Sequence, residues 1–249
     1  MPSPSGEFAD EVPAEQSSAA AAPQHPPALG GESHRPGIAR DELQYVDSGV
    51  HVRELIECAT ALLGTRPVAA ERMLLQALGT GVDVLSGEQR ARLRSLVVTA
   101  IAQQPGREDD LAAAALAAAG GWADISVGDA AHHTVIAARI HYRGGHYRSA
   151  AALFARALSR GELPYPQEEI AVLYEQLGRC LDEGRRYRAA ARAYTAGAAV
   201  IAGRTQWAEL HADLTDAADR SRQSARHPGA ILRAWVRSSQ PDGGTPEHR

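Results

Sequence analysis

The chain has 249 residues, 44% of them hydrophobic, which is enough to bury one sizeable core or a stack of about four helical hairpins. Its formal net charge is only −4, so no strong overall field attracts it to nucleic acid or to an anionic membrane, and we expect neither as a partner. All 26 Lys+Arg residues are arginines, which excludes a lysine-containing phosphate loop and a Schiff-base lysine.

The first segment, residues 1–46, is rich in proline, alanine and serine and shows no hydrophobic periodicity. Such a composition cannot bury enough apolar surface to offset the entropy lost on ordering, so it predicts a disordered tail. The segment also lacks the basic start and apolar centre of a secretory signal, which favours a cytoplasmic protein. A second disordered tail is expected over residues 238–249.

A first helical hairpin is expected from about Ser48. Apolar residues recur at helical spacing over residues 52–63, and Gly64 suits the end of that helix. Pro67 suits the first turn of a second helix, which is expected to end at Gly79–Gly81.

A second hairpin is expected to start at Ser86. Ser86 and Gln89 fit a capping box, in which each side chain accepts a hydrogen bond from the other residue's backbone amide. The remaining expected elements are a helix over residues 93–101, a turn at Pro105–Gly106, a helix over residues 111–119 and a turn at Gly120–Gly121.

Residues 131–204 carry one pattern twice, which predicts a third and a fourth hairpin. Tight turns are expected at Gly144–Gly145 and at Gly184–Arg185. Aligning the copies pairs Tyr147 with Tyr187, Ala150 with Ala190, Phe154 with Tyr194 and Ala157 with Gly197. The small residues mark where two helices must touch. Beyond this region, Trp207, Leu210, Leu214 and Ala217 predict an amphipathic capping helix, and a short helix is expected from Pro228.

This pattern resembles the tetratricopeptide repeat, in which a helical hairpin of about 34 residues buries its inner face only against its neighbours. Equivalent hairpin starts lie near residues 51, 89, 131 and 171. This longer period also resembles the helical-repeat regions of large bacterial ATPase-type transcriptional regulators. The resemblance implies an all-α fold, a right-handed α-solenoid of about four antiparallel hairpins with a C-terminal capping helix, over residues 47–237.

The resemblance also places the first helix of each hairpin along a concave groove. The groove residues that it implies are His132, Arg139, Tyr142 and Arg143 in the third hairpin, and Glu175, Arg179 and Asp182 in the fourth. Arginines there would pair with carboxylates of an extended or helical peptide, which predicts a non-enzymatic adaptor for a protein or peptide partner. A solvated helix face explains the same residues equally simply. A second hypothesis is a free-standing sensor or regulatory domain that binds a small ligand or a transcriptional regulator.

The histidines, the cysteines and the possible catalytic residues of this sequence do not have the spacing of a metal site or an active site. His133 and His141 are eight residues apart, two turns along one helix, and no carboxylate or cysteine completes a site, so we expect neither a metal nor another cofactor. No triad order or nucleophile motif occurs, so we do not expect an enzyme. Cys58 and Cys180 lie in apolar helical patterns and are expected to be buried, reduced thiols. A homodimer contact near Trp235 is a further alternative, because exposed aromatic clusters mark interfaces.

Overall fold

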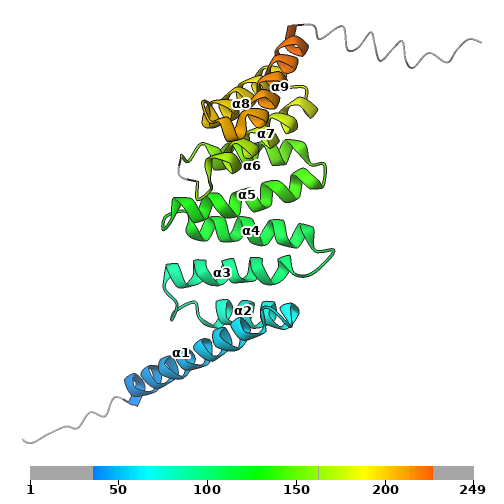
Figure 1. The fold of residues 1–249 in the computed structure, drawn as a ribbon. Coiled ribbons are helices and arrows are strands. Elements are labelled where there is room, and N and C mark those ends of the chain that lie inside the picture. The colour runs from blue at the N-terminus through cyan, green and yellow to red at the C-terminus, as the bar shows by residue number, and fades with distance from the viewer. Residues whose placement is uncertain (1–35, 162, 227–249) are drawn as a thin grey trace, which may run out of the picture.

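The structure is a computed structural model that describes the backbone of residues 36–161 and 163–226, and the side chains from residue 48 onward within these ranges. This part of the chain is helical and contains no strand, and its helices pack mainly against their neighbours in sequence (Figure 1). The predicted all-α helical stack is therefore confirmed. The helices are α1 (Pro36–Leu62), α2 (Pro67–Thr80), α3 (Gly87–Ala102), α4 (Glu108–Trp122), α5 (Val127–Arg143), α6 (Tyr147–Leu158), α7 (Gln167–Glu183), α8 (Tyr187–Ile201), the 3₁₀ helix η1 (Thr205–Trp207) and α9 (Ala208–Arg226).

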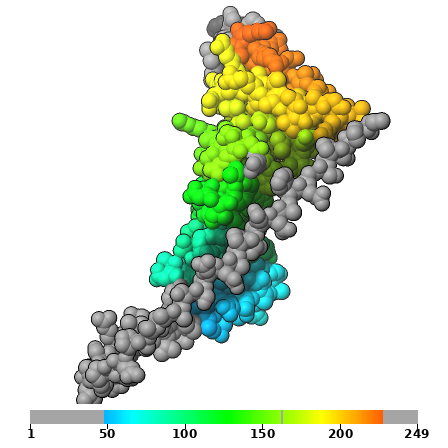
Figure 2. All heavy atoms as spheres, turned by 90° about the vertical axis from the view of Figure 1, so that its left-hand side faces the viewer, coloured from blue at the N-terminus to red at the C-terminus, as the bar shows by residue number. Residues whose placement is uncertain are grey.

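The described helices form an elongated column, with α1 at one end and the α8–α9 pair at the other (Figures 1 and 2). Helix α1 begins at Pro36, ahead of the expected start at Ser48. Proline is well suited to the first turn of a helix because its fixed φ is already helical. The expected boundary at residue 47 thus falls inside α1. The tail predictions for residues 1–35 and 238–249, and the short helix with Trp235, lie outside the described residues.

The core is built mainly from alanine, with a few large side chains. Fully buried alanines such as Ala59, Ala77 and Ala138 let neighbouring helices approach closely. The buried residues fall into separate clusters along the column. One joins α1, α2 and α3 around Leu74, and the largest joins α5 to α9 around Phe154. Helix α9 closes this second cluster with Leu214, as the predicted capping helix requires.

The two tight turns predicted for the repeated pattern are confirmed. Gly145 has a φ of 74°, and the His146 amide donates to the His141 carbonyl at 2.8 Å while the Gly145 amide donates to Tyr142 at 3.1 Å. These two hydrogen bonds define a Schellman motif, which ends a helix with one left-handed residue. The second copy has the same bonds, from Arg186 to Leu181 and from Arg185 to Asp182, with Arg185 itself at a φ of 55°.

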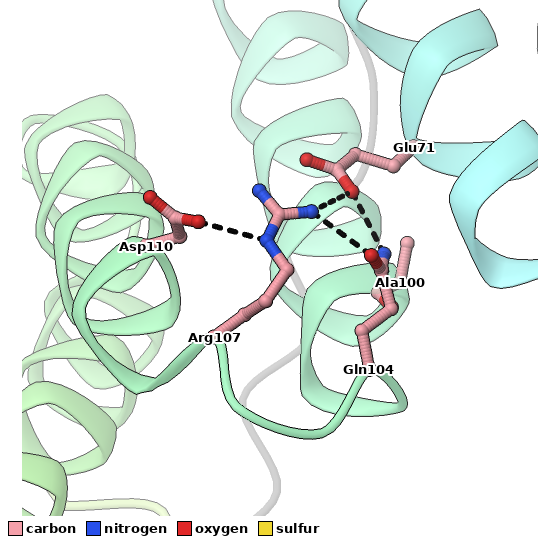
Figure 3. A network of polar contacts seen from close by, with 5 residues as sticks. All are labelled: Glu71, Ala100, Gln104, Arg107 and Asp110. Atoms are coloured by element: carbon pink, nitrogen blue, oxygen red, sulfur yellow. Dashed lines mark hydrogen bonds and ion pairs between the residues drawn. The ribbon is translucent and has the colours of Figure 1, made fainter.

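The capping box of the second hairpin is also confirmed, with the Gln89 amide 3.1 Å from Ser86 Oγ and the Ser86 amide 2.8 Å from Gln89 Oε1. The second hairpin is joined to the first through the carboxylate of Glu71 on α2, which is only 8% exposed (Figure 3). Arg107 Nη1 and Gln104 Nε2 donate to Glu71 Oε2 at 2.6 and 2.7 Å. Arg107 Nε also pairs with Asp110 at 2.8 Å, so one guanidinium holds α2, α4 and the turn before α4 together.

The predicted turn at Gly120–Gly121 is wrong, because both glycines lie inside α4, which continues to Trp122. A Cβ on Gly121 would lie 2.8 Å from Arg94 Nη1 and 3.5 Å from the Ala91 Cα. Gly121 thus lies where α4 contacts α3, and only the flexible end of the Arg94 side chain would have to move to make room for a Cβ.

Candidate functional site

Two of the predicted groove residues on α5 contact the segment that precedes α7 and α7 itself. His132 Nδ1 lies 2.7 Å from the Tyr165 hydroxyl, and Arg139 Nη2 lies 2.8 Å from Glu169 Oε1. The Arg139 guanidinium also lies over the Tyr165 ring, 6.0 Å from its centroid. Partial burial lowers the pKa of His132 and raises that of Tyr165 to about 12, so both side chains are neutral at pH 7. These contacts join the third hairpin to the fourth.

The predicted groove residues on α7 are held in the same way by groups of this chain. Arg179 Nη2 pairs with Glu175 Oε1 at 2.5 Å, and the Tyr142 hydroxyl is the main cause of its raised pKa. Asp182 accepts a hydrogen bond from the Tyr194 hydroxyl at 3.1 Å, and Ser221 Oγ lies 2.9 Å from both of its carboxylate oxygens. Asp182 therefore ties α7 to α8 and α9.

Arg143, the last of the predicted groove residues, is exposed and lines a separate cavity of about 310 Å³ between α4 and the end of α5. The acidic side chains of Glu108 and Asp109 line the same cavity. The predicted groove residues therefore take part in several separate contacts along the column. Arg139 and Arg179 each have a carboxylate of this chain within ion-pair distance.

A buried polar cluster joins α3, α4 and α5. Ser95 Oγ lies 2.7 Å from His133 Nε2 and accepts a hydrogen bond from Trp122 Nε1 at 2.9 Å. A serine beside a histidine resembles the start of a catalytic dyad, but His133 is only 6% exposed, and no described residue forms a hydrogen bond with its Nδ1 that could orient the ring. Burial lowers the pKa of His133 to about 4, so the ring is neutral. The hydrogen bonds of this cluster hold α3, α4 and α5 together.

The lowered pKa of His133 predicts that the stability of the protein depends on pH. The folded-state pKa of His133 lies below the ordinary value of 6.5, so its contribution is complete above pH 6.5 and is lost as the pH falls through about 4. We expect the melting temperature of the wild type to fall more steeply between pH 6.5 and 4 than that of His133→Gln, which cannot titrate. His132 titrates in both proteins, so its effect on the melting temperature cancels in the comparison. Parallel melting curves across this range would show that His133 does not couple to folding.

A cavity of about 950 Å³ lies between α8 and α9, at the end of the column. We call it the arginine pocket. Its lining consists mainly of arginine and alanine. The lining residues are Arg188, Ala191, Arg192, Thr195, Ala196, Ala199, Arg222, Ala225 and Arg226.

The arginine pocket is positively charged because its lining contains four arginines and no acidic residue. Helix α8 contains no acidic residue. Arg222 is held by Asp219, 2.5 Å from Nη1, and by Thr195 Oγ1, 2.7 Å from Nη2. Within the described ranges, Arg188, Arg192 and Arg226 form no ion pair. Three guanidinium groups are therefore available to an anionic ligand.

Sequence reasoning missed this pocket, although part of its signal is visible in the sequence. Arg188 and Arg192 are four residues apart on α8, and Arg222 and Arg226 are four residues apart on α9, so each pair forms a stripe on one helix face. The signal becomes specific only when α9 packs against α8 and brings the two stripes to one cavity.

Other features of the described residues bear on function. No group of three metal-binding side chains occurs among them, and none of their helices is long and apolar enough to cross a membrane. Cys180 is buried as expected, and burial raises its pKa to about 11. The prediction for Cys58 is wrong, because its side chain lies on the exposed side of α1 next to the buried Ala59.

Comparison with protein-family models and with curated protein sequences gave no match.

Proposed function

We propose that this protein is a non-enzymatic adaptor, similar to tetratricopeptide arrays, that binds an acidic segment of a protein partner in the arginine pocket. The observation that carries this proposal is a cavity of about 950 Å³ with four arginines, three of them without a carboxylate partner in the described part of the chain. A stack of helical hairpins supports such a role, because these arrays offer extended surfaces to other proteins.

The chemistry of the pocket suits a peptide that is acidic and partly apolar. A guanidinium group donates two parallel hydrogen bonds to a carboxylate, which a point charge cannot do. Ala191, Ala196 and Ala199 contribute apolar surface to the lining, on which aliphatic or aromatic side chains of the same peptide can pack. The predicted row on α5 and α7 is less suited to capture a carboxylate, because Arg139 and Arg179 already pair with Glu169 and Glu175.

Fluorescence anisotropy with a labelled 12-residue peptide of alternating glutamate and leucine tests this proposal. We expect Arg188→Glu with Arg192→Glu to weaken binding by about tenfold or more, because two attractive charges become repulsive. Arg148→Glu with Arg160→Glu is the matched control, since both side chains are exposed on or just after α6, outside the pocket. Affinity of the wild type should fall as salt is raised from about 50 to 500 mM.

The same assay distinguishes the other surfaces and ligands. An equal loss in the α6 control, or no loss in the pocket variant, contradicts the proposal. If only Arg139→Glu with Arg143→Glu weakens binding of the peptide, the peptide binds at the predicted groove residues on α5 and α7 instead. Tighter binding of a single-stranded oligonucleotide than of the peptide would overturn the choice of a protein partner.

A sensor for a small anionic ligand is the second candidate, favoured by the size of the arginine pocket, which lies within the usual range for small-molecule sites. A thermal-shift screen of phosphorylated and carboxylated metabolites tests it. A reproducible rise in melting temperature that is absent in Arg188→Glu with Arg192→Glu would support the sensor.

A further inference from the structure

The negative charge of this protein is concentrated in the segment before α1. Residues 1–35 contain five acidic residues and one arginine, which equals the whole formal charge of −4. The remaining residues, 36–249, carry equal numbers of acidic and basic side chains. Within the acidic segment, residues 7–15 (EFADEVPAE) hold four carboxylates together with Phe8 and Val12. This composition matches a pocket lined by arginines and alanines.

We propose that residues 7–15 of one copy of this chain bind in the arginine pocket of a second copy. The inference rests on the proposed function, since it assigns one particular acidic peptide to that pocket. Charge complementarity selects this segment over the one that follows α9. Residues 227–249 contain three arginines and only two acidic residues, so they lack the excess of negative charge that residues 7–15 carry.

The size of the molecule favours a second copy over the same copy. Residues 16–35 separate the acidic segment from Pro36 at the start of α1. Fully extended, these residues span at most about 70 Å. The arginine pocket lies at the opposite end of the column, seven helix-to-helix steps from α1, or about 55–70 Å at normal packing distances (Figure 1). Contact within one chain would thus require nearly full extension, whereas a neighbouring copy imposes no such demand.

Binding of this kind joins unlike surfaces, the segment of one copy and the pocket of the next. Such contacts close when two copies exchange their segments or when several copies form a ring, and otherwise they leave one free segment and one free pocket at the ends of an open assembly. Association therefore grows with concentration and weakens with salt, because it depends on charge. An acidic segment of another protein would compete for the same pocket.

Sedimentation velocity of the full chain tests the proposal over a range of concentrations at about 50 and 500 mM salt. We expect the wild type to associate at low salt. Neutralising the segment (Glu7→Gln, Asp10→Asn, Glu11→Gln, Glu15→Gln) and reversing the pocket (Arg188→Glu, Arg192→Glu) should each weaken association at least tenfold. A chain that combines Glu11→Arg and Glu15→Arg with Arg188→Glu and Arg192→Glu should regain association, because the two new arginines of the segment can pair with the two new glutamates of the pocket. Arg148→Glu with Arg160→Glu should leave association unchanged.

Each other outcome overturns the proposal in a distinct way. A wild type that stays monomeric while the glutamate–leucine peptide still binds removes the self-contact and leaves the proposed function standing. Association that persists after neutralisation of residues 7–15 assigns the contact to another surface. A monomeric chain whose affinity for the peptide rises when the segment is neutralised shows that the segment occupies the pocket of its own copy.

Discussion

Gly178→Ala is expected to lower the free energy of unfolding by about 2–3 kcal/mol, although alanine is the better helix former. Gly178 lies in α7 against α8. A Cβ at this position would lie between 2.5 and 2.7 Å from three ring atoms of Tyr194. The ring cannot move aside easily, because it is only 4% exposed and its hydroxyl donates to Asp182. The overlap must therefore be relieved by separating the two helices.

Gly120→Ala provides the matched control for this prediction. Gly120 is also a helical glycine, but a Cβ there would meet nothing within 4 Å. We expect this change to stabilise the protein by about 0.5–1 kcal/mol through helix propensity and the unfolded-state entropy. Urea unfolding followed by circular dichroism measures both. If Gly178→Ala costs as much in a Tyr194→Ala background as in the wild type, then Tyr194 is not the obstacle.

Features of the fold that depend on neighbouring residues could be predicted from the sequence, and features that depend on distant residues could not. The helices, the Schellman turns and the Ser86 capping box depend on residues close in sequence, so they were predictable. The pair Gly120–Gly121 looks like Gly144–Gly145 but lies inside a helix. Here α4 continues to Trp122, its last residue, which is 8% exposed and donates a hydrogen bond to Ser95. That partner is 27 residues away and has no local signal.

The candidate site depends even more on contacts between distant residues. Arg139 was expected to be available to a partner, yet its carboxylate comes from Glu169, thirty residues further along the chain. The arginine pocket needs two stripes that belong to different helices, and neither Arg188 nor Arg222 is unusual by itself. Sequence periodicity identifies which face of a helix is polar, but the packing of α9 on α8 decides which polar faces meet.

Phe154→Ala is expected to have the largest effect on stability, a loss of about 3–5 kcal/mol, because Phe154 is fully buried at the centre of the α5–α9 cluster. The buried clusters of this column are distinct and are linked through partly buried residues such as Leu111 and Leu153, so each hairpin depends mainly on its neighbours. The loss should therefore be confined to one end. Hydrogen exchange resolved by segment should accelerate over α5–α9 and change little over α1 and α2.

Leu74→Ala is the counterpart at the other end, a fully buried side chain in the cluster of α1, α2 and α3. We expect it to cost about 2–5 kcal/mol and to accelerate exchange over α1–α3 instead. The two variants also separate stability from function. The arginine pocket belongs to the part of the column that Phe154 supports, so Phe154→Ala should weaken binding of the acidic peptide at temperatures where Leu74→Ala still binds normally. Uniform acceleration of exchange in both variants would mean that the column unfolds as one unit, and binding would then fall equally in both.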